Sequence, residues 1–180
     1  MKIVIAGNGK VGGALTGQLV AEGHDLILID SDSEALESGM EQYDIMSVQG
    51  NCASMETLRQ AGIEDADLLI ATTGSDEVNL LACMTAHALN RGLHTIARIR
   101  NPEYTDQAYM MKEHFALSMD FNPDRQTAIE IDRLLKYPGF LKRDAFADGR
   151  VEIVELRVDE KSKLCCTTLI RMIGIVKCKV

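Results

Sequence analysis

Short runs of apolar residues, almost free of polar side chains, recur along the chain at 3–6, 26–29 and 68–71. A strand that is apolar on both faces is typical of a parallel sheet that helices cover on each side. Between these runs lie segments in which apolar residues recur with helical spacing, such as 11–22 and 76–90. The alternation predicts an α/β fold, a Rossmann-like doubly wound parallel sheet.

The same patterns predict the individual elements. The predicted strands are 2–6, 26–30, 45–48, 67–72, 94–99 and 116–119. The predicted helices are 11–22, 33–40, 54–61, 76–90 and 103–113. Gly23 and Gly92 follow two of these helices, at the position where a left-handed glycine commonly ends a helix.

The pattern changes after Asn122. Residues 124–136 predict a crossover helix with an apolar stripe of its own, which packs either against another subunit or back on its own domain. Residues 151–158 predict a half-exposed antiparallel strand. We therefore expect three parts: a nucleotide-binding domain at 1–122, the crossover helix and linker at 123–149, and the incomplete beginning of a small C-terminal unit at 150–180.

Composition narrows the function classes. The formal net charge is −8 and aromatic residues make up 4% of the chain, which argues against nucleic acid or anionic lipid as a partner. The five cysteines include no Cys-x-x-Cys pair, so we expect reduced thiols rather than disulfides or zinc. No apolar run reaches the length of a membrane span, and Met1 leads directly into a predicted strand. We expect a cytoplasmic protein without direct membrane insertion.

The motif Gly7-x-Gly9-x-x-Gly12 lies between the first predicted strand and the first predicted helix. In that setting Gly7 allows a tight turn, Gly9 lets the backbone approach a pyrophosphate, and Gly12 lets helix and strand pack closely. The free N–H groups at the start of helix 11–22 would face the phosphates, where the helix dipole favours negative charge. The motif predicts a dinucleotide site.

Asp30 ends the second predicted strand. A carboxylate at this place accepts hydrogen bonds from both ribose hydroxyls of an adenosine and repels a 2′-phosphate. Residues 31–34 supply no arginine to offset that repulsion, so NAD or NADH fits and NADP does not. The alternative is that Asp30 only caps the helix that follows.

The loops after the other predicted strands complete the candidate site, because ligands of such sheets lie across the carboxyl ends of the strands. Arg98 is placed to meet phosphate charge, with a surface ion pair as the alternative. Asn51 would reach the adenine edge. The full set of candidate cofactor-binding residues is Gly7, Asn8, Gly9, Lys10, Val11, Gly12, Asp30, Ser31, Asn51, Cys52, Thr72, Thr73, Gly74 and Arg98.

The sequence contains no recognisable set of catalytic residues. None of the four histidines falls at the carboxyl end of a predicted strand, and no Tyr-x-x-x-Lys pair, Gly-x-Ser-x-Gly elbow or metal-ligand cluster is present. We therefore expect a protein that senses its nucleotide and is not an enzyme.

Three segments carry a family resemblance: "MKIVIAGNGKVGGALTGQLVAEGHDLILID", "GNCASMETLRQAGIEDADLLIATTGSDEVNLLACMTAHALN" and "TIARIRNPEY". They resemble the Trk/Ktr potassium-uptake regulatory subunits, whose nucleotide module is the TrkA-N domain, also called KTN or RCK. The resemblance implies a dimer or larger ring at the cytosolic face of the membrane that controls a potassium transporter or channel. It implies NAD or NADH as the ligand, with ATP or ADP in some branches, and a crossover helix that reaches a neighbouring subunit.

Carried over by position, the resemblance places the three motif glycines on the phosphates, Asp30 on the ribose, and Thr73 and Arg98 on the pyrophosphate side. This chain departs from the family pattern at Asn51-Cys52, where Asp-Ala is usual, and at Gly74, where an acid is common. Our hypothesis is a nucleotide-sensing regulatory subunit. The alternatives are a fragment of an NAD-dependent oxidoreductase whose substrate domain lies beyond residue 180, and a nucleotide-binding module with another partner.

Overall fold

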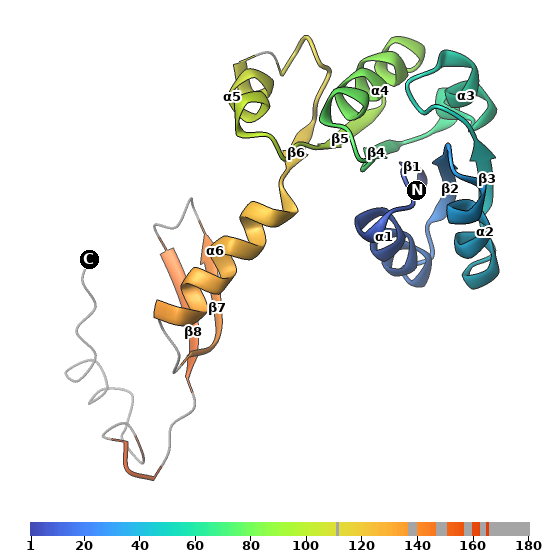
Figure 1. Ribbon diagram of the computed structural model, residues 1–180. Coiled ribbons are helices and arrows are strands. Elements are labelled where there is room, and N and C mark those ends of the chain that lie inside the picture. The colour runs from blue at the N-terminus through green and yellow to red at the C-terminus, as the bar shows by residue number, and fades with distance from the viewer. Residues whose placement is uncertain (111, 137–139, 147–150, 157–159, 163–164, 166–180) are drawn as a thin grey trace. The chain divides into compact units, whose positions relative to one another are not determined.

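The computed structural model describes residues 1–110, 112–136, 140–146, 151–156, 160–162 and 165 (Figure 1). The chain divides into two compact units, residues 1–126 and 127–180, and each is described by itself. Within the described parts, no helix combines the length and apolar composition needed to cross a bilayer.

A six-stranded parallel sheet forms the first unit, as the apolar runs predict. In chain order its strands are β1 (Lys2–Ala6), β2 (Asp25–Asp30), β3 (Met46–Gln49), β4 (Leu68–Ala71), β5 (His94–Arg98) and β6 (Met119–Phe121). Their order across the sheet is β3-β2-β1-β4-β5-β6, and every neighbouring pair is parallel. The order reverses between β1 and β4, which is where a Rossmann sheet leaves a crevice for a ligand.

Helices connect the strands and cover the sheet. They are α1 (Lys10–Ala21), α2 (Ser33–Gln42), α3 (Met55–Gln60), the 3-10 turn η1 (Ile63–Asp65), α4 (Asp76–Leu89) and α5 (Pro102–Met110). Alternate residues of β1 enter two separate buried clusters: Val4 packs in the cluster that contains Leu58 of α3, and Ile3 packs in the one that contains Leu36 of α2. Both faces of the strand are therefore buried, which explains its unbroken apolar sequence.

Several details differ from the sequence prediction. Helix α5 ends at Met110 rather than at 113, and residues 112–113 lie in a turn. The last strand is 119–121 rather than 116–119, because Ala116 adopts a left-handed turn (φ 52°) and strand pairing begins only at Met119, opposite Ile96. Gly23 is left-handed (φ +79°) and ends α1 as predicted, but Gly92 is not left-handed. The C-cap of α4 is Asn90, whose backbone is extended (φ −136°) and whose N–H donates to the Ala86 carbonyl oxygen at 2.8 Å.

Helix α6 (Pro123–Lys136) begins in the first unit and continues into the second, at the position predicted for the crossover helix. Its apolar residues Ile131, Leu134 and Leu135 are exposed. The second unit also contains β7 (Phe140–Phe146) and β8 (Val151–Leu156), which form an antiparallel pair. The sequence pattern predicts β8 but not β7, whose residues fall within the predicted linker. The last two positions of the predicted strand, 157–158, lie outside the described residues.

Candidate functional site

A cavity of about 770 Å³ opens at the carboxyl ends of the strands of the first unit. This volume is within the range of small-molecule sites. The residues that line it are Gly7, Gly9, Lys10, Ile29, Asp30, Ser31, Gly50, Asn51, Cys52, Thr72, Thr73, Gly74, Ser75, Val78 and Arg98. The structure therefore brings together the candidate residues from five separate loops, with the exceptions of Asn8, Val11 and Gly12.

The three motif glycines have different surroundings. Gly7 is left-handed (φ +98°), and a Cβ there would lie 2.9 Å from the backbone nitrogen of Thr73. A Cβ on Gly12 would lie 1.8 Å from the carbonyl oxygen of Gly7. A Cβ on Gly9 would meet nothing within 4 Å. Gly7 and Gly12 thus allow the backbone to pack, whereas Gly9 leaves open space beside the cavity.

Asn8 contributes through its backbone and not through its side chain. Its N–H donates to Asp30 Oδ2 at 2.7 Å, while its side-chain Nδ2 donates to the carbonyl oxygen of Ala35 at 2.5 Å. The amide group therefore faces the start of α2 and does not line the cavity. Val11 and Gly12 lie in the first turn of α1 and do not line it either.

The Asp30 carboxylate is held in place by backbone donors. Oδ2 accepts the Asn8 N–H, and Oδ1 accepts the Asp32 N–H at 3.0 Å. Because a carboxylate oxygen can accept more than one hydrogen bond, both oxygens keep capacity for a ligand. The N-cap of α2 is Asp32, whose Oδ1 accepts the Glu34 N–H at 3.0 Å, so the alternative that Asp30 caps this helix is wrong.

The amino end of α1 lacks a side-chain cap, as does α3, whereas α2 and α4 have one. Its N-cap is Gly9, no side chain accepts from its first N–H groups, and its first turn has no acidic residue. In contrast, Asp32 caps α2 and Ser75 caps α4. Lys10, the first residue of α1, lines the cavity. The positive end of α1 and a lysine therefore both favour an anion at this place.

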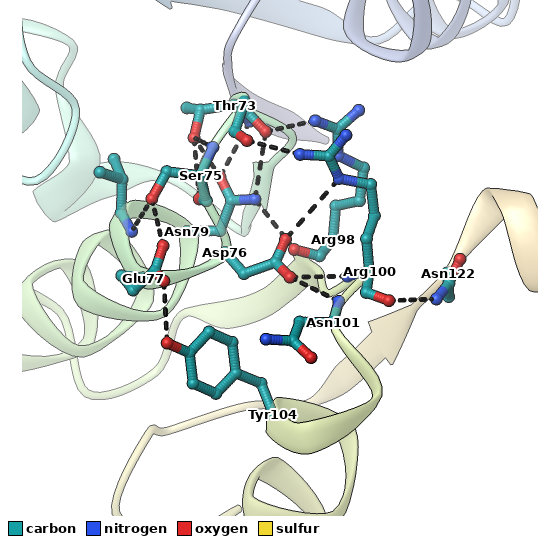
Figure 2. Close-up of polar contacts among 12 residues, drawn as sticks. Thr73, Ser75, Asp76, Glu77, Asn79, Arg98, Arg100, Asn101, Tyr104 and Asn122 are labelled. Atoms are coloured by element: carbon teal, nitrogen blue, oxygen red, sulfur yellow. Dashed lines mark hydrogen bonds and ion pairs between the residues drawn. The ribbon is translucent and has the colours of Figure 1, made fainter.

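The loop after β4 and the end of β5 form another part of the cavity wall, and the loop lies beside the glycine motif. Figure 2 shows the polar contacts of this part. The Thr73 N–H and hydroxyl both donate to Asn79 Oδ1, at 2.8 and 2.7 Å. The guanidinium of Arg98 donates to the Thr73 carbonyl oxygen. Among the described residues no carboxylate lies within ion-pair distance of Arg98, so this part of the structure does not show the surface ion pair of the alternative. Burial lowers the pKa of Arg98, and the nearby charge of Arg100 lowers it further.

Four residues that line the cavity are missing from the predicted set: Ile29, Gly50, Ser75 and Val78. Gly50 and Ser75 directly adjoin predicted site residues in the loops after β3 and β4, so their positions in the sequence were a usable signal. Ile29 and Val78 are apolar residues of a strand and a helix. Their sequence pattern is that of ordinary core residues, and no signal distinguishes them.

Cys52 is a buried thiol that lines the cavity. Burial raises its pKa to about 11, and burial raises the pKa of Cys83, which is fully buried, to about 12. These thiols stay protonated at neutral pH and are poor nucleophiles. Within the described residues there is also no group of three or more His, Cys, Asp or Glu side chains that could hold a metal ion.

These raised pKa values predict that the protein loses stability in alkali. Above pH 9, the ordinary pKa of the thiol, an unfolded chain releases the Cys52 proton, while the folded chain keeps it until about pH 11. The free energy of unfolding should therefore fall with rising pH, by up to ~1.4 kcal/mol per pH unit for each thiol. Denaturant unfolding in this pH interval measures the slope. A Cys52→Ala protein should show a shallower slope, and an identical slope would contradict the assignment.

The strand order, the glycine loop, the acid at the end of β2 and the cavity at the reversal of strand order together define a nucleotide-binding fold of the Rossmann type. Residues 3–118 match the model of the TrkA-N domain, and the chain belongs to this family.

Curated relatives are potassium-uptake proteins. The chain is 40% identical over 159 residues to the Trk system potassium uptake protein TrkA of Haemophilus influenzae, covering 87% of this chain and 35% of the relative. It is 39% identical over 163 residues to a TrkA homolog of Archaeoglobus fulgidus, covering 91% of this chain and 37% of the relative. The chain thus spans about a third of the length of these relatives.

Solved structures share the fold. The TrkA-N domain of the inner membrane protein ybaL from Escherichia coli superposes with a TM-score of 0.67 at 25% identity, covering 74% of this chain and 96% of that one. The GsuK channel bound to NAD gives a TM-score of 0.65 at 25% identity, covering 81% of this chain and 26% of that one. GsuK bound to ADP gives 0.64 at 27% identity, covering 76% of this chain and 34% of that one.

Proposed function

We propose that this chain is a nucleotide-sensing, non-catalytic part of a potassium-uptake system. NAD or NADH, or alternatively ATP or ADP, binds in the cavity, and its occupancy controls a membrane potassium transporter or channel. The observation that carries the proposal is the cavity itself. It joins an uncapped helix end at one side to a carboxylate held by two backbone donors at another.

The phosphates of the ligand would lie between α1 and the loop after β4. The first N–H groups of α1 and the side chain of Lys10 provide positive charge from one side, and Arg98 provides it from the other. Because Gly9 has no Cβ, the phosphate oxygens have room to approach the backbone there. This arrangement suits a diphosphate, which NAD, NADH, ADP and ATP all contain.

The adenosine would lie toward β2 and β3. The two Asp30 oxygens would accept the ribose hydroxyls, and a 2′-phosphate would be repelled. Asn51, which is exposed on the cavity, and the buried Cys52 would adjoin the adenine. The chemistry therefore favours NAD or NADH over NADP.

The relatives support the partner and the ligand. The TrkA proteins are named for potassium uptake, and GsuK is a channel whose structures contain NAD and ADP. By analogy this chain would act as a homo-oligomer at the cytoplasmic face of the membrane, beside a transporter or channel subunit. The exposed apolar residues Ile131, Leu134 and Leu135 of α6 are consistent with contact to a neighbouring subunit.

A Gly9→Ala protein tests the phosphate site. The backbone at Gly9 (φ −69°) accepts alanine, and the added methyl group meets no protein atom, so the fold should be unchanged. The methyl group would occupy the space of the phosphates, and the affinity for NADH and ADP should fall at least tenfold, or ~1.4 kcal/mol. Calorimetric titration of the wild type and the variant with NAD, NADH, ATP and ADP measures this.

Gly13→Ala is the matched control. Gly13 lies in the same helix but does not line the cavity, and its Cβ would make an ordinary contact of 3.4 Å with Asn8 Oδ1. Its nucleotide affinity should equal that of the wild type. A wild-type protein that binds none of the four nucleotides, or a Gly9→Ala protein that binds them all as tightly, would rule out the proposed site.

A further inference from the structure

Two loops at the cavity wall hold each other by reciprocal hydrogen bonds (Figure 2). One is the loop after β4, residues 73–75, and the other is the segment 98–101 at the end of β5. Side chains of α4, which follows the first loop, bind the backbone of the second. Arginine side chains of the second segment bind the backbone of the first. We call this set of contacts the loop clamp.

The α4 half of the loop clamp consists of Asp76 and Asn79. Asp76 Oδ2 accepts the N–H groups of Arg100 and Asn101, both at 2.8 Å. Asn79 Nδ2 donates to the Arg98 carbonyl oxygen at 2.9 Å. The backbone from the Arg98 carbonyl group to Asn101 is therefore fixed to the start of α4.

The other half of the loop clamp consists of the side chains of Arg98 and Arg100, which bind the backbone of the loop after β4. Arg98 donates to the Thr73 carbonyl oxygen, and Arg100 donates to the Gly74 carbonyl oxygen at 2.6 Å. Thr73, Gly74 and Arg98 line the cavity, whereas Asp76 and Arg100 do not. Asp76 does not line the cavity itself, but the segments it holds carry residues that do.

Asp76 is an unusual residue for a purely structural contact, because its carboxylate is buried. The residue is 6% exposed, and its Oδ1 has no hydrogen-bond partner among the described residues. Arg100 Nε lies 4.0 Å from this oxygen. A buried carboxylate is unfavourable unless donors and charges compensate it. Here the compensation comes from the amino end of α4, from two backbone N–H groups and from the charge of Arg100.

We infer that Asp76 is a positioning residue for the phosphate wall of the cavity: through the backbone of Arg100 and Asn101 it holds Arg98 and the 73–74 loop where they meet a ligand's phosphates. The inference rests on the proposed function. It assigns to Asp76 an effect on the phosphate part of the ligand alone, because the adenosine part lies at Asp30 and Asn51, across the cavity.

An Asp76→Asn protein distinguishes two roles for Asp76, because the two roles predict opposite changes in the affinity for ADP. The asparagine side chain has the same shape, but its amide NH2 group is a donor that would face either Arg100 Nε or the backbone N–H groups, which are donors too. The loop clamp should therefore loosen. If Asp76 positions the wall, the affinity for ADP should fall about tenfold, while the affinity for adenosine changes less than twofold. If Asp76 acted only as a negative charge near an anion, its removal would strengthen ADP binding.

The experiment is calorimetric titration of ADP and of adenosine, each at the same ionic strength, into the wild type and the variants. Asp67→Asn is the matched control. Asp67 also accepts a backbone N–H at 2.8 Å, from Lys2, but it does so at the amino ends of the strands. The control should bind both ligands as the wild type does. Hydrogen exchange should also quicken at the amides of Arg100 and Asn101 in Asp76→Asn alone.

A second variant serves if Asp76→Asn does not fold. Arg100→Lys keeps the positive charge of an exposed residue but loses the fork that reaches Gly74 and Asp76. It should weaken ADP binding several-fold and leave adenosine binding unchanged. Unchanged or tighter ADP binding, or an equal loss for both ligands, would overturn the inference while the proposed function stands. A wild type that binds none of NAD, NADH, ATP and ADP would overturn both.

Discussion

A Gly12→Ala protein should be severely destabilised and should lose nucleotide binding. The added Cβ would lie 1.8 Å from the carbonyl oxygen of Gly7, 2.9 Å from its carbonyl carbon and 3.0 Å from Thr72 Oγ1. Two of these atoms belong to the backbone, so no side chain can rotate away to make room. The turn at Gly7 must then move, and its N–H bond to the Ile29 carbonyl oxygen at 2.7 Å moves with it. We expect a loss of about 3 kcal/mol or more in the free energy of unfolding.

Denaturant unfolding of Gly12→Ala beside Gly13→Ala measures this effect. The two substitutions add the same methyl group to adjacent residues of α1. Gly13→Ala should change the free energy of unfolding by less than about 1 kcal/mol, with a tendency toward stabilisation because alanine favours helix. A Gly12→Ala protein as stable as the control would show that the loop is not packed as described.

Replacing Asp30 with alanine should remove most of the affinity for adenosine nucleotides while the protein stays folded. The two ribose hydroxyls lose a charged acceptor, and hydrogen bonds of that kind contribute about 1.5–3 kcal/mol. The affinity should fall at least tenfold, or ~1.4 kcal/mol. The backbone N–H groups of Asn8 and Asp32 also lose their acceptor, so the free energy of unfolding should fall by about 1–3 kcal/mol.

The ligand series separates the loss of the ribose contact from general damage. NADP carries a 2′-phosphate that Asp30 repels, so the ratio of NADP affinity to NAD affinity should rise in Asp30→Ala. Asp25→Ala is the control, because Asp25 lies exposed at the opposite end of the same strand. Calorimetric titration with both dinucleotides measures the ratio. Unchanged NAD affinity in Asp30→Ala would remove the ribose assignment.

The sheet was predictable because its central strands are buried on both faces, and such burial leaves a direct record in the sequence. The apolar runs located β1, β2 and β4 to within one or two residues of their bounds. The edge strand β6 has only three residues, and the turn at Ala116 that precedes it has no marker in the sequence. Its position was therefore displaced.

Strand β7 was missed for a different reason. Its centre contains Lys142, Arg143 and Asp144 in succession, so neither an apolar run nor an alternation is present. The strand exists by pairing with β8, and pairing between segments is a tertiary contact that single-sequence patterns do not record.

The cavity was predictable where polar residues or glycines follow strands, because parallel strands bring their carboxyl ends to one edge of the sheet. Asn8 was placed there as well, but its side chain binds the Ala35 carbonyl oxygen in α2. That contact depends on how α2 packs beside the glycine loop. Ile29 and Val78 line the cavity through packing in the same way.

The central place of β1 has a consequence for how the first unit assembles. β1 pairs with β2 soon after it in the chain, but its other edge pairs with β4, which joins Ile3 to Leu68. Contacts between such distant segments form slowly, since a long loop must close first. The turn at Gly7 rests against Thr73, which arrives with β4. We therefore expect the turn at Gly7 to be completed late in folding, and a nascent chain that ends before β4 to lack the part of the cavity wall that Thr72–Ser75 form.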